Sequence, residues 1–293
     1  FAWVPIMQGC NKFCTYCIVP YVRGRETSRT IEDIKAEVIS LAQDGYKEIT
    51  LLGQNVNSYG LDFKNNTDFS DLIRALDTVE GIKRIRYMTS HPRDMTKEMV
   101  DVMAASSKVV RHMHLPVQHG SNEMLKRMNR GYTVEHFYEM VDYIRERMPD
   151  VGFTTDLITG FPGETEEMHQ ATIALLKKVR FDSAYTFIYS PRRGTPAASM
   201  TNQISDEIKH RRLNEIMEVQ NQISLEINKE LEGQDIEILV EGPTKQDENH
   251  WFGRTSTNKM IVFPKVEGIK IGDIVLAHVN IAQTWILKGI VKD

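Results

Sequence analysis

The sequence predicts an α/β protein: a (β/α) barrel, open and built from six strand–helix units, followed by a small all-β barrel. Six apolar, strand-like segments alternate with helical patterns up to about residue 190, which favours right-handed crossovers and a parallel sheet. A long helical pattern then covers 205–231. After Gly233 the sequence changes to short alternating segments with Gly, Pro and Asn turns. Periodicity alone leaves open whether the first six strands form a barrel or an open sheet.

Hydrophobic spacing justifies each element in order. Apolar segments predict strands at 1–9, 47–54, 82–90, 112–118, 151–160 and 183–190. Apolar residues at helical spacing predict helices at 29–45, 69–79, 96–106, 121–129, 133–147 and 164–179. The later segments alternate like short antiparallel strands, enough for a five-stranded OB-like barrel. We therefore expect one domain at 1–231, which includes the long helix, and a second at 232–293.

Composition excludes several classes of protein. The 293 residues carry a formal net charge of −4, so any surface that binds nucleic acid has to be locally basic. No apolar run approaches the roughly 20 residues that span a bilayer, and no signal peptide is visible. The three cysteines have no distant partners for a disulfide framework. We expect a cytoplasmic, monomeric protein with no membrane partner.

All three cysteines lie within eight residues, at Cys10, Cys14 and Cys17, where the first predicted strand ends. Thiolates bind zinc and iron–sulfur clusters. A structural zinc site needs four ligands, and the nearest histidine, His91, is distant in the sequence. Three cysteines can hold a 4Fe–4S cluster with one iron left open for a substrate. Three inert buried thiols are the alternative, but this CxxxCxxC spacing favours the cluster.

This spacing, with Tyr16 directly before the last cysteine, resembles the radical S-adenosylmethionine (SAM) enzymes. The resemblance implies a full or partial (β/α) barrel with the site at the C-terminal ends of its strands. It implies one 4Fe–4S cluster whose open iron chelates the amino and carboxylate groups of SAM. Reductive cleavage of the sulfonium then gives a 5′-deoxyadenosyl radical, so an electron donor such as flavodoxin or ferredoxin is an expected partner.

Polar residues at the predicted strand ends are candidates for binding SAM. The family binds the amino group after the second strand, often with an acidic residue, which Gln54-Asn55 replaces here. An arginine can pair with the carboxylate, and Arg127 and Arg130 both qualify, with a solvated surface role as the alternative. We expect no catalytic side chain beyond the cluster and the cofactor. The candidate cofactor-binding residues are Tyr16, Gln54, Asn55, Asn57, Ser90, Gln118, Arg130 and Asp156.

Longer motifs narrow the resemblance to the methylthiotransferases, and within them to the tRNA 2-methylthio-isopentenyladenosine synthase subgroup. The matching segments are 9–29, 53–59, 90–92, 114–133, 156–167 and 187–197. The resemblance implies that a methylthio group is added to carbon 2 of isopentenylated adenosine in the anticodon stem-loop of tRNA. Sibling enzymes act on threonylcarbamoyl-adenosine tRNA or on a ribosomal protein aspartate. A non-catalytic, metal-bearing RNA-binding module is an alternative of another class.

The family also has an N-terminal domain with three further cysteines that hold an auxiliary cluster. This chain starts with Phe1, where that domain would end, and has no spare cysteine. We therefore expect a fragment that lacks the auxiliary-cluster domain and is incomplete for full turnover.

The C-terminal segment resembles a TRAM domain, an OB-like RNA-binding barrel. Residues 229–293 hold eight basic and ten acidic residues, which is no electrostatic footprint for RNA. Phe252, Arg254 and Asn258 on one predicted hairpin can contact unpaired bases, although such residues can equally belong to the barrel core. Arg192 and Arg193, in the loop after the sixth strand, are candidates to meet phosphate.

Overall fold

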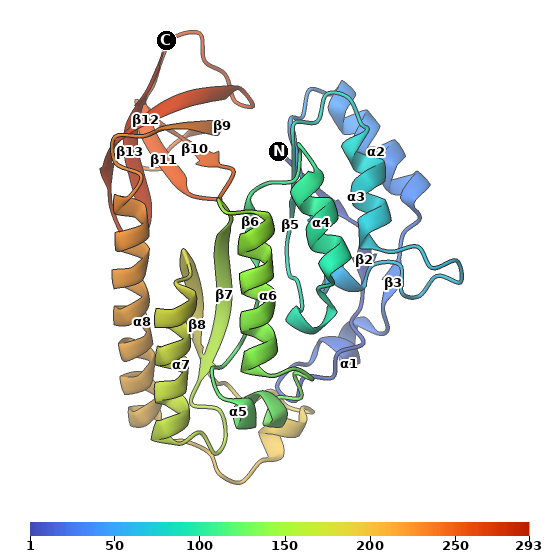
Figure 1. Ribbon diagram of the computed structural model, residues 1–293, viewed down its shortest axis with the longest axis vertical. Helices are drawn as coiled ribbons and strands as arrows, with labels where there is room; N and C mark the ends of the chain where they lie inside the picture. The colour runs from blue at the N-terminus through green and yellow to red at the C-terminus, as the bar shows by residue number, and fades with distance from the viewer. Residues whose placement is uncertain (293) are drawn as a thin grey trace.

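A computed structural model describes residues 1–292. It consists of an open half-barrel of parallel strands and a closed five-stranded β-barrel at one end of it (Figure 1). Helix α8 (Asp206–Lys229) runs along the half-barrel and leads into the second barrel. No helix among residues 1–292 combines the length and the apolar character needed to cross a membrane.

The half-barrel contains six parallel strands in two three-stranded sheets, with orders β1-β4-β5 and β6-β7-β8. A parallel bridge between Ile85 and Val109 joins the two sheets. Among residues 1–292, β1 and β8 have no further partner strand and form the two free edges, and the predicted partial barrel of six units is confirmed. The strands are β1 (Ala2–Pro5), β4 (Glu48–Leu52), β5 (Arg84–Tyr87), β6 (His112–His114), β7 (Gly152–Thr159) and β8 (Ser183–Ile188).

Helices cover the outer face of these strands (Figure 1). The side chains of Thr30, Asp68, Thr96, Thr133, Thr165 and Ser205 each accept a hydrogen bond from the first turn of a helix, which explains where these helices begin. The helices are α1 (Val19–Arg23), α2 (Ile31–Gln43), α3 (Phe69–Asp77), α4 (Lys97–Ala105), α5 (Asn122–Arg127), α6 (Val134–Arg147) and α7 (Glu166–Val179). A short hairpin pairs β2 (Met7–Gln8) with β3 (Thr27–Ser28).

The inner face of the half-barrel is polar, because side chains alternate between the two faces of a strand. Apolar residues such as Ile49 and Phe153 belong to the core under the helices. Their neighbours face the lumen, where the guanidinium of Arg86 donates to Glu48 at 3.1 Å between Nε and Oε1. His112 and His114 each lie 3.0 Å from the Thr154 hydroxyl. This buried polar lumen was not predicted from the sequence.

The second barrel is closed, with strand order β10-β11-β13-β12-β9. The prediction of antiparallel strands is wrong at one pair, because β11 and β13 run parallel. A closed ring with an odd number of strands cannot alternate direction throughout, so at least one parallel pair is required. The strands are β9 (Asp235–Pro243), β10 (His250–Thr255), β11 (Met260–Pro264), β12 (Ile274–Ala282) and β13 (Ile286–Val291).

The turn after β10, residues 255–259, packs against the amino ends of the half-barrel strands. Arg86 donates to the carbonyl oxygen of Thr255 at 3.4 Å, and the backbone N–H of Arg111 donates to Ser256 Oγ at 2.8 Å. Lys259 forms a partly buried ion pair with Asp182, directly before β8. This turn therefore covers the end of the lumen that lies away from the cysteines.

Candidate active site

The cysteine loop follows β2 and is held by contacts with residues 24–26. Gly9 has a φ of +77°, and a Cβ there would lie 2.0 Å from the carbonyl oxygen of Arg25, so only glycine fits. Asn11 is fixed by the Glu26 carboxylate, which accepts from its backbone and its side chain at 3.1 and 3.0 Å. Burial raises the pKa of the Cys10 thiol to about 11. A metal would therefore have to displace the proton, since metals bind the thiolate.

A cavity of about 350 Å³ lies beside this loop, at the carboxyl ends of the half-barrel strands. All three cysteines line it. Seven of the eight predicted cofactor-binding residues line it as well: Tyr16, Gln54, Asn55, Ser90, Gln118, Arg130 and Asp156. Asn57 lies behind the wall, where its amide donates to the carbonyl oxygen of His91 at 3.4 Å. The structure thus brings these residues to one place, while their individual roles stay predictions.

Four buried polar atoms of the cavity wall have no hydrogen-bond partner among the described residues: Gln54 Oε1, Ser90 Oγ, His91 Nε2 and Gln118 Oε1. Leaving such an atom unpaired costs about 1–3 kcal/mol, so a wall that carries four of them fits a polar ligand. The amino group, carboxylate, ribose hydroxyls and adenine of SAM offer matching donors and acceptors. The donor set of three thiols and these atoms therefore fits a cluster with SAM beside it.

His91 lines the cavity but is not among the cofactor-binding residues predicted from the sequence. Its Nδ1 accepts from the backbone N–H of Arg93 at 3.2 Å, so the ring proton sits on the unpaired Nε2, which is a free donor. Burial, with Arg130, Lys12 and Arg93 nearby, lowers the pKa of His91 to about 2. The imidazole is therefore neutral at physiological pH. Its position at a strand end, beside Ser90, was the signal that could have identified it.

Arg130, and not Arg127, reaches the cavity. Its guanidinium donates to Cys14 Sγ at 3.3 Å and to the carbonyl oxygen of Pro116 at 2.6 Å. Arg127 is partly exposed and pairs with Glu123 on the same helix. Arg130 thus brings a fixed positive charge to the sulfur of one cysteine.

Asn55 uses both of its side-chain groups within the protein. Its oxygen accepts from the backbone N–H of His91 at 3.0 Å, and its amide donates to Asp94 at 2.6 Å. Asp94 also forms an ion pair with Lys12 at 2.8 Å. Asn55 therefore joins the end of β4, the loop after β5 and the cysteine loop, while Gln54 keeps a free acceptor.

Comparison with known proteins places this geometry in a family. Residues 4–176 match the Radical SAM superfamily, and residues 229–292 match the TRAM domain. The chain belongs to the radical SAM superfamily. Both parts of the resemblance predicted from the sequence are confirmed.

Curated relatives cover nearly all of this radical SAM chain. The tRNA-2-methylthio-N(6)-dimethylallyladenosine synthase of Carboxydothermus hydrogenoformans is 53% identical over 289 residues, which are 99% of this chain and 66% of the relative. The protein of the same name from Thermoanaerobacter sp. strain X514 is 55% identical over 290 residues, 98% of this chain and 61% of the relative. This chain therefore spans less than two thirds of the length of these relatives.

Solved radical SAM structures share the fold. Coproporphyrinogen III oxidase (HemN) from Escherichia coli superimposes with a TM-score of 0.58 at 16% identity, over 87% of this chain and 66% of that chain. The radical SAM methyltransferase TsrM from Kitasatospora setae gives 0.56 at 21% identity, over 68% of this chain and 38% of that chain. At such low identity these likenesses support the fold alone.

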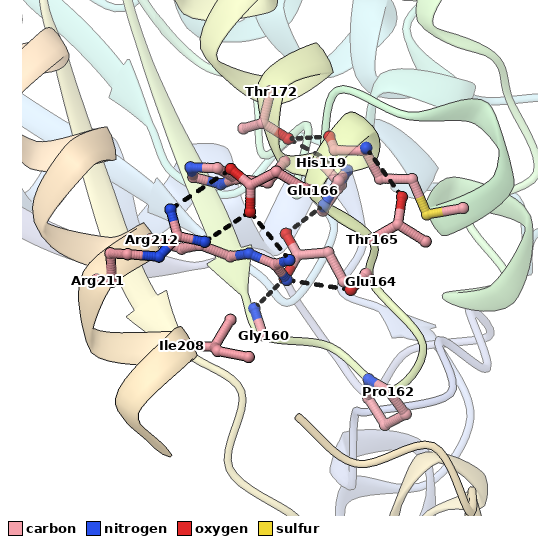
Figure 2. Close-up of polar contacts among 12 residues, drawn as sticks. His119, Gly160, Pro162, Glu164, Thr165, Glu166, Thr172, Ile208, Arg211 and Arg212 are labelled. Carbon is pink, nitrogen blue, oxygen red and sulfur yellow. Dashed lines mark hydrogen bonds and ion pairs between the residues drawn. The ribbon is translucent and has the colours of Figure 1, made fainter. Parts of the chain in front are cut away.

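A buried ionic cluster holds the loop after β7, which packs behind the radical SAM cavity (Figure 2). The Glu164 carboxylate accepts from His119 Nε2 at 2.9 Å, from Arg212 on α8 at 3.0 Å, and from the backbone N–H of Gly160. Although burial opposes ionisation, the hydrogen bond from His119 helps to hold the pKa of Glu164 below its usual value. The loop that this cluster holds carries Phe161, whose ring packs 6.5 Å from that of Tyr16. Arg212 was not predicted as a residue that supports the site.

The predicted RNA-contacting residues lie at two ends of the molecule. Arg192 and Arg193 are exposed after β8, on the side of the cysteine loop. Phe252, Arg254 and Asn258 lie in the TRAM barrel at the other end. The Arg254 side chain pairs with Glu241 at 2.9 Å, and its carbonyl oxygen accepts from Arg84 at 2.8 Å. Part of this hairpin thus serves the contact between the domains, and its RNA contacts stay a prediction.

Proposed function

We propose that this chain is the catalytic part of a tRNA methylthiotransferase that modifies carbon 2 of N6-dimethylallyladenosine beside the anticodon. The observation that carries the proposal is a cavity with three cysteines and four unpaired polar atoms, in a chain that also ends in a TRAM domain. The relatives, at 53–55% identity, are named for this reaction. We infer this activity for the whole protein, because the relatives named for it are longer than this chain.

The residues present fit the cofactors of such an enzyme. Cys10, Cys14 and Cys17 would hold one 4Fe–4S cluster and leave one iron open. A reduced cluster held there would supply one electron to the sulfonium of SAM, and SAM would supply the group that abstracts hydrogen. The side chains around the cavity bind and orient SAM, and none of them has to act as an acid or base.

Each unpaired atom suits one part of SAM. Gln54 Oε1 is an acceptor for the amino group, and Arg130 offers a charge to the carboxylate. Ser90 and Gln118 offer hydrogen bonds to the ribose. The neutral His91 offers one further hydrogen-bond donor, its Nε2–H. The N–H that Arg130 donates to Cys14 Sγ also favours the reduced state of a cluster, because hydrogen bonds to its sulfurs set the potential.

The partners follow from this reaction. We propose a tRNA anticodon stem-loop as substrate, a flavodoxin- or ferredoxin-type electron donor, and a monomeric enzyme in the cytoplasm. Arg192 and Arg193 are exposed in a loop that contacts the cysteine loop, and they would meet RNA phosphate there.

Nucleoside mass spectrometry of tRNA tests the proposal. The gene that encodes this chain is disrupted in its own host, then restored either intact or as Cys17→Ala. We expect loss of 2-methylthio-dimethylallyladenosine, accumulation of dimethylallyladenosine, and recovery with the intact gene alone. Loss of the methylthio form of threonylcarbamoyl-adenosine, or of a modified ribosomal protein aspartate, would reassign the substrate. Unchanged tRNA and ribosomal protein would refute the methylthiotransferase assignment.

A further inference from the structure

Two aromatic side chains on the free edge of the half-barrel are unusually open to solvent. Tyr185 and Phe187 on β8 are each 51% exposed. They stand two residues apart and so point to the same face of the strand. The ring of Tyr185 packs against His114 with centroids 5.8 Å apart, and His114 faces the polar lumen. Both aromatic rings therefore line the open side of the lumen.

These rings adjoin the cofactor cavity. Tyr185 pairs in register with Asp156, which lines that cavity. Phe187 lies two residues further toward the carboxyl end of β8, in register with Ile158. On the other free edge, Trp3 of β1 is 53% exposed and shares its register with the lumen-facing Thr50. Both free edges thus carry an exposed aromatic side chain, and the aromatic residues of β8 adjoin the cofactor cavity through Asp156.

The same edge leads to the TRAM barrel. A second cavity, of about 190 Å³, lies where β8 meets that barrel, and Tyr185, Arg254, Asn258 and Trp285 line it. Tyr185 therefore borders both the residues predicted to contact RNA and the lumen that leads to the cofactor. Exposed apolar side chains that gather beside a cavity mark binding sites, unlike singly scattered ones, and unpaired bases stack on aromatic rings.

We propose, resting on the function above, that Tyr185 and Phe187 position the substrate base. The adenine of the target nucleotide stacks on these rings as it enters the lumen from the side, and its dimethylallyl group lies on their apolar surface. The aromatic edge of β8 is continuous with the TRAM barrel at one end and with the cofactor cavity at the other. This continuity favours an RNA strand over a protein segment as the occupant.

Binding of a synthetic anticodon stem-loop RNA that carries N6-dimethylallyladenosine tests the proposal. The full-length enzyme with its cluster and SAM is compared with Tyr185→Leu, Phe187→Leu and Tyr185→Phe. The Tyr46→Leu variant is the matched control, because Tyr46 is another exposed aromatic residue, placed after α2 and away from both cavities. The second readout is the affinity for SAM without RNA, which loss of stacking leaves unchanged.

We expect Tyr185→Leu and Phe187→Leu each to weaken RNA binding by roughly 5- to 150-fold, the range for one base on one aromatic ring. Tyr185→Phe should bind like the wild type, because the stacking ring is kept, and Tyr46→Leu should do the same. Wild-type affinity in both leucine variants would overturn the inference. If those variants lose SAM affinity in proportion, the two rings support the fold and the inference is also wrong. Failure of the wild-type enzyme to bind this RNA would instead contradict the proposed function.

Discussion

The ionic cluster around Glu164 gives the sharpest test of how the site is supported. Replacement of Arg212 by methionine keeps much of the side-chain volume and removes the charge. Glu164 and Arg212 are 1% and 5% exposed, so the carboxylate would stay buried with only His119 and Gly160 as donors. Removing one partner of a buried pair costs about 3–5 kcal/mol. Arg211→Met is the control, because Arg211 is 54% exposed and its pair with Glu166 is worth about 0–1 kcal/mol.

Thermal unfolding of the cluster-free protein measures the difference. For a domain of this size, 1 kcal/mol shifts Tm by about 2–4 °C. We therefore expect Arg212→Met to lower Tm by roughly 6–20 °C and Arg211→Met by less than about 4 °C. Adding Glu164→Gln to Arg212→Met should restore part of the loss, because the unpaired charge is then gone. Equal Tm values for the two arginine variants, or no recovery in the double variant, would refute this account of the cluster.

Three further predictions concern the cavity. Cys10→Ala, Cys14→Ala or Cys17→Ala should each abolish the cluster, which iron and sulfide analysis and the brown colour of the anaerobic protein would report; the wild-type chain should bind about four irons, and more than that would contradict a single cluster. Gln54→Leu should weaken SAM binding by roughly 10-fold in equilibrium dialysis, because the variant has no acceptor for the amino group; unchanged affinity would remove this role. His91 should destabilise the fold as pH falls below about 6.5, because the unfolded chain then takes up a proton that the buried ring refuses until about pH 2. His91→Gln should flatten that part of the stability–pH curve by up to about 1.4 kcal/mol per pH unit, and an unchanged slope in urea titrations would exclude His91 as its cause.

The strands and their order along the chain were predictable, because hydrophobic periodicity is a local property of the sequence. The carboxyl ends of parallel strands meet at one end of a barrel, so polar residues after separate strands could be assigned to one cavity. Spacing along one helix could not decide between Arg127 and Arg130, since both lie near its end and only tertiary packing buries one of them. The different roles of Gln54, which keeps a free acceptor, and Asn55, whose side chain is bonded within the protein, could not be predicted either. The difference depends on Asp94 and His91, which belong to another strand end.

Longer-range features left no local pattern. Glu164 pairs with Arg212, which lies 48 residues further along the chain on helix α8. No rule based on sequence spacing predicts this pair. The polar lumen did leave a trace, because the segments RIRY (84–87) and HMH (112–114) alternate polar and apolar residues. Strands of parallel sheets are usually apolar on both faces, so this alternation was the signal for an interior that is not a hydrophobic core.

The turn at 255–259 blocks the amino end of the lumen with backbone and charged groups of another domain. That end is closed to ligands, so the proposed RNA substrate, the spent cofactor and the fresh cofactor would all use the remaining openings. An RNA strand bound along the open edge of the half-barrel would block this opening, and cofactor exchange would wait until the RNA dissociates. An enzyme that consumes more than one cofactor molecule per product would therefore have to release and recapture its substrate between visits, or keep a gap beside it.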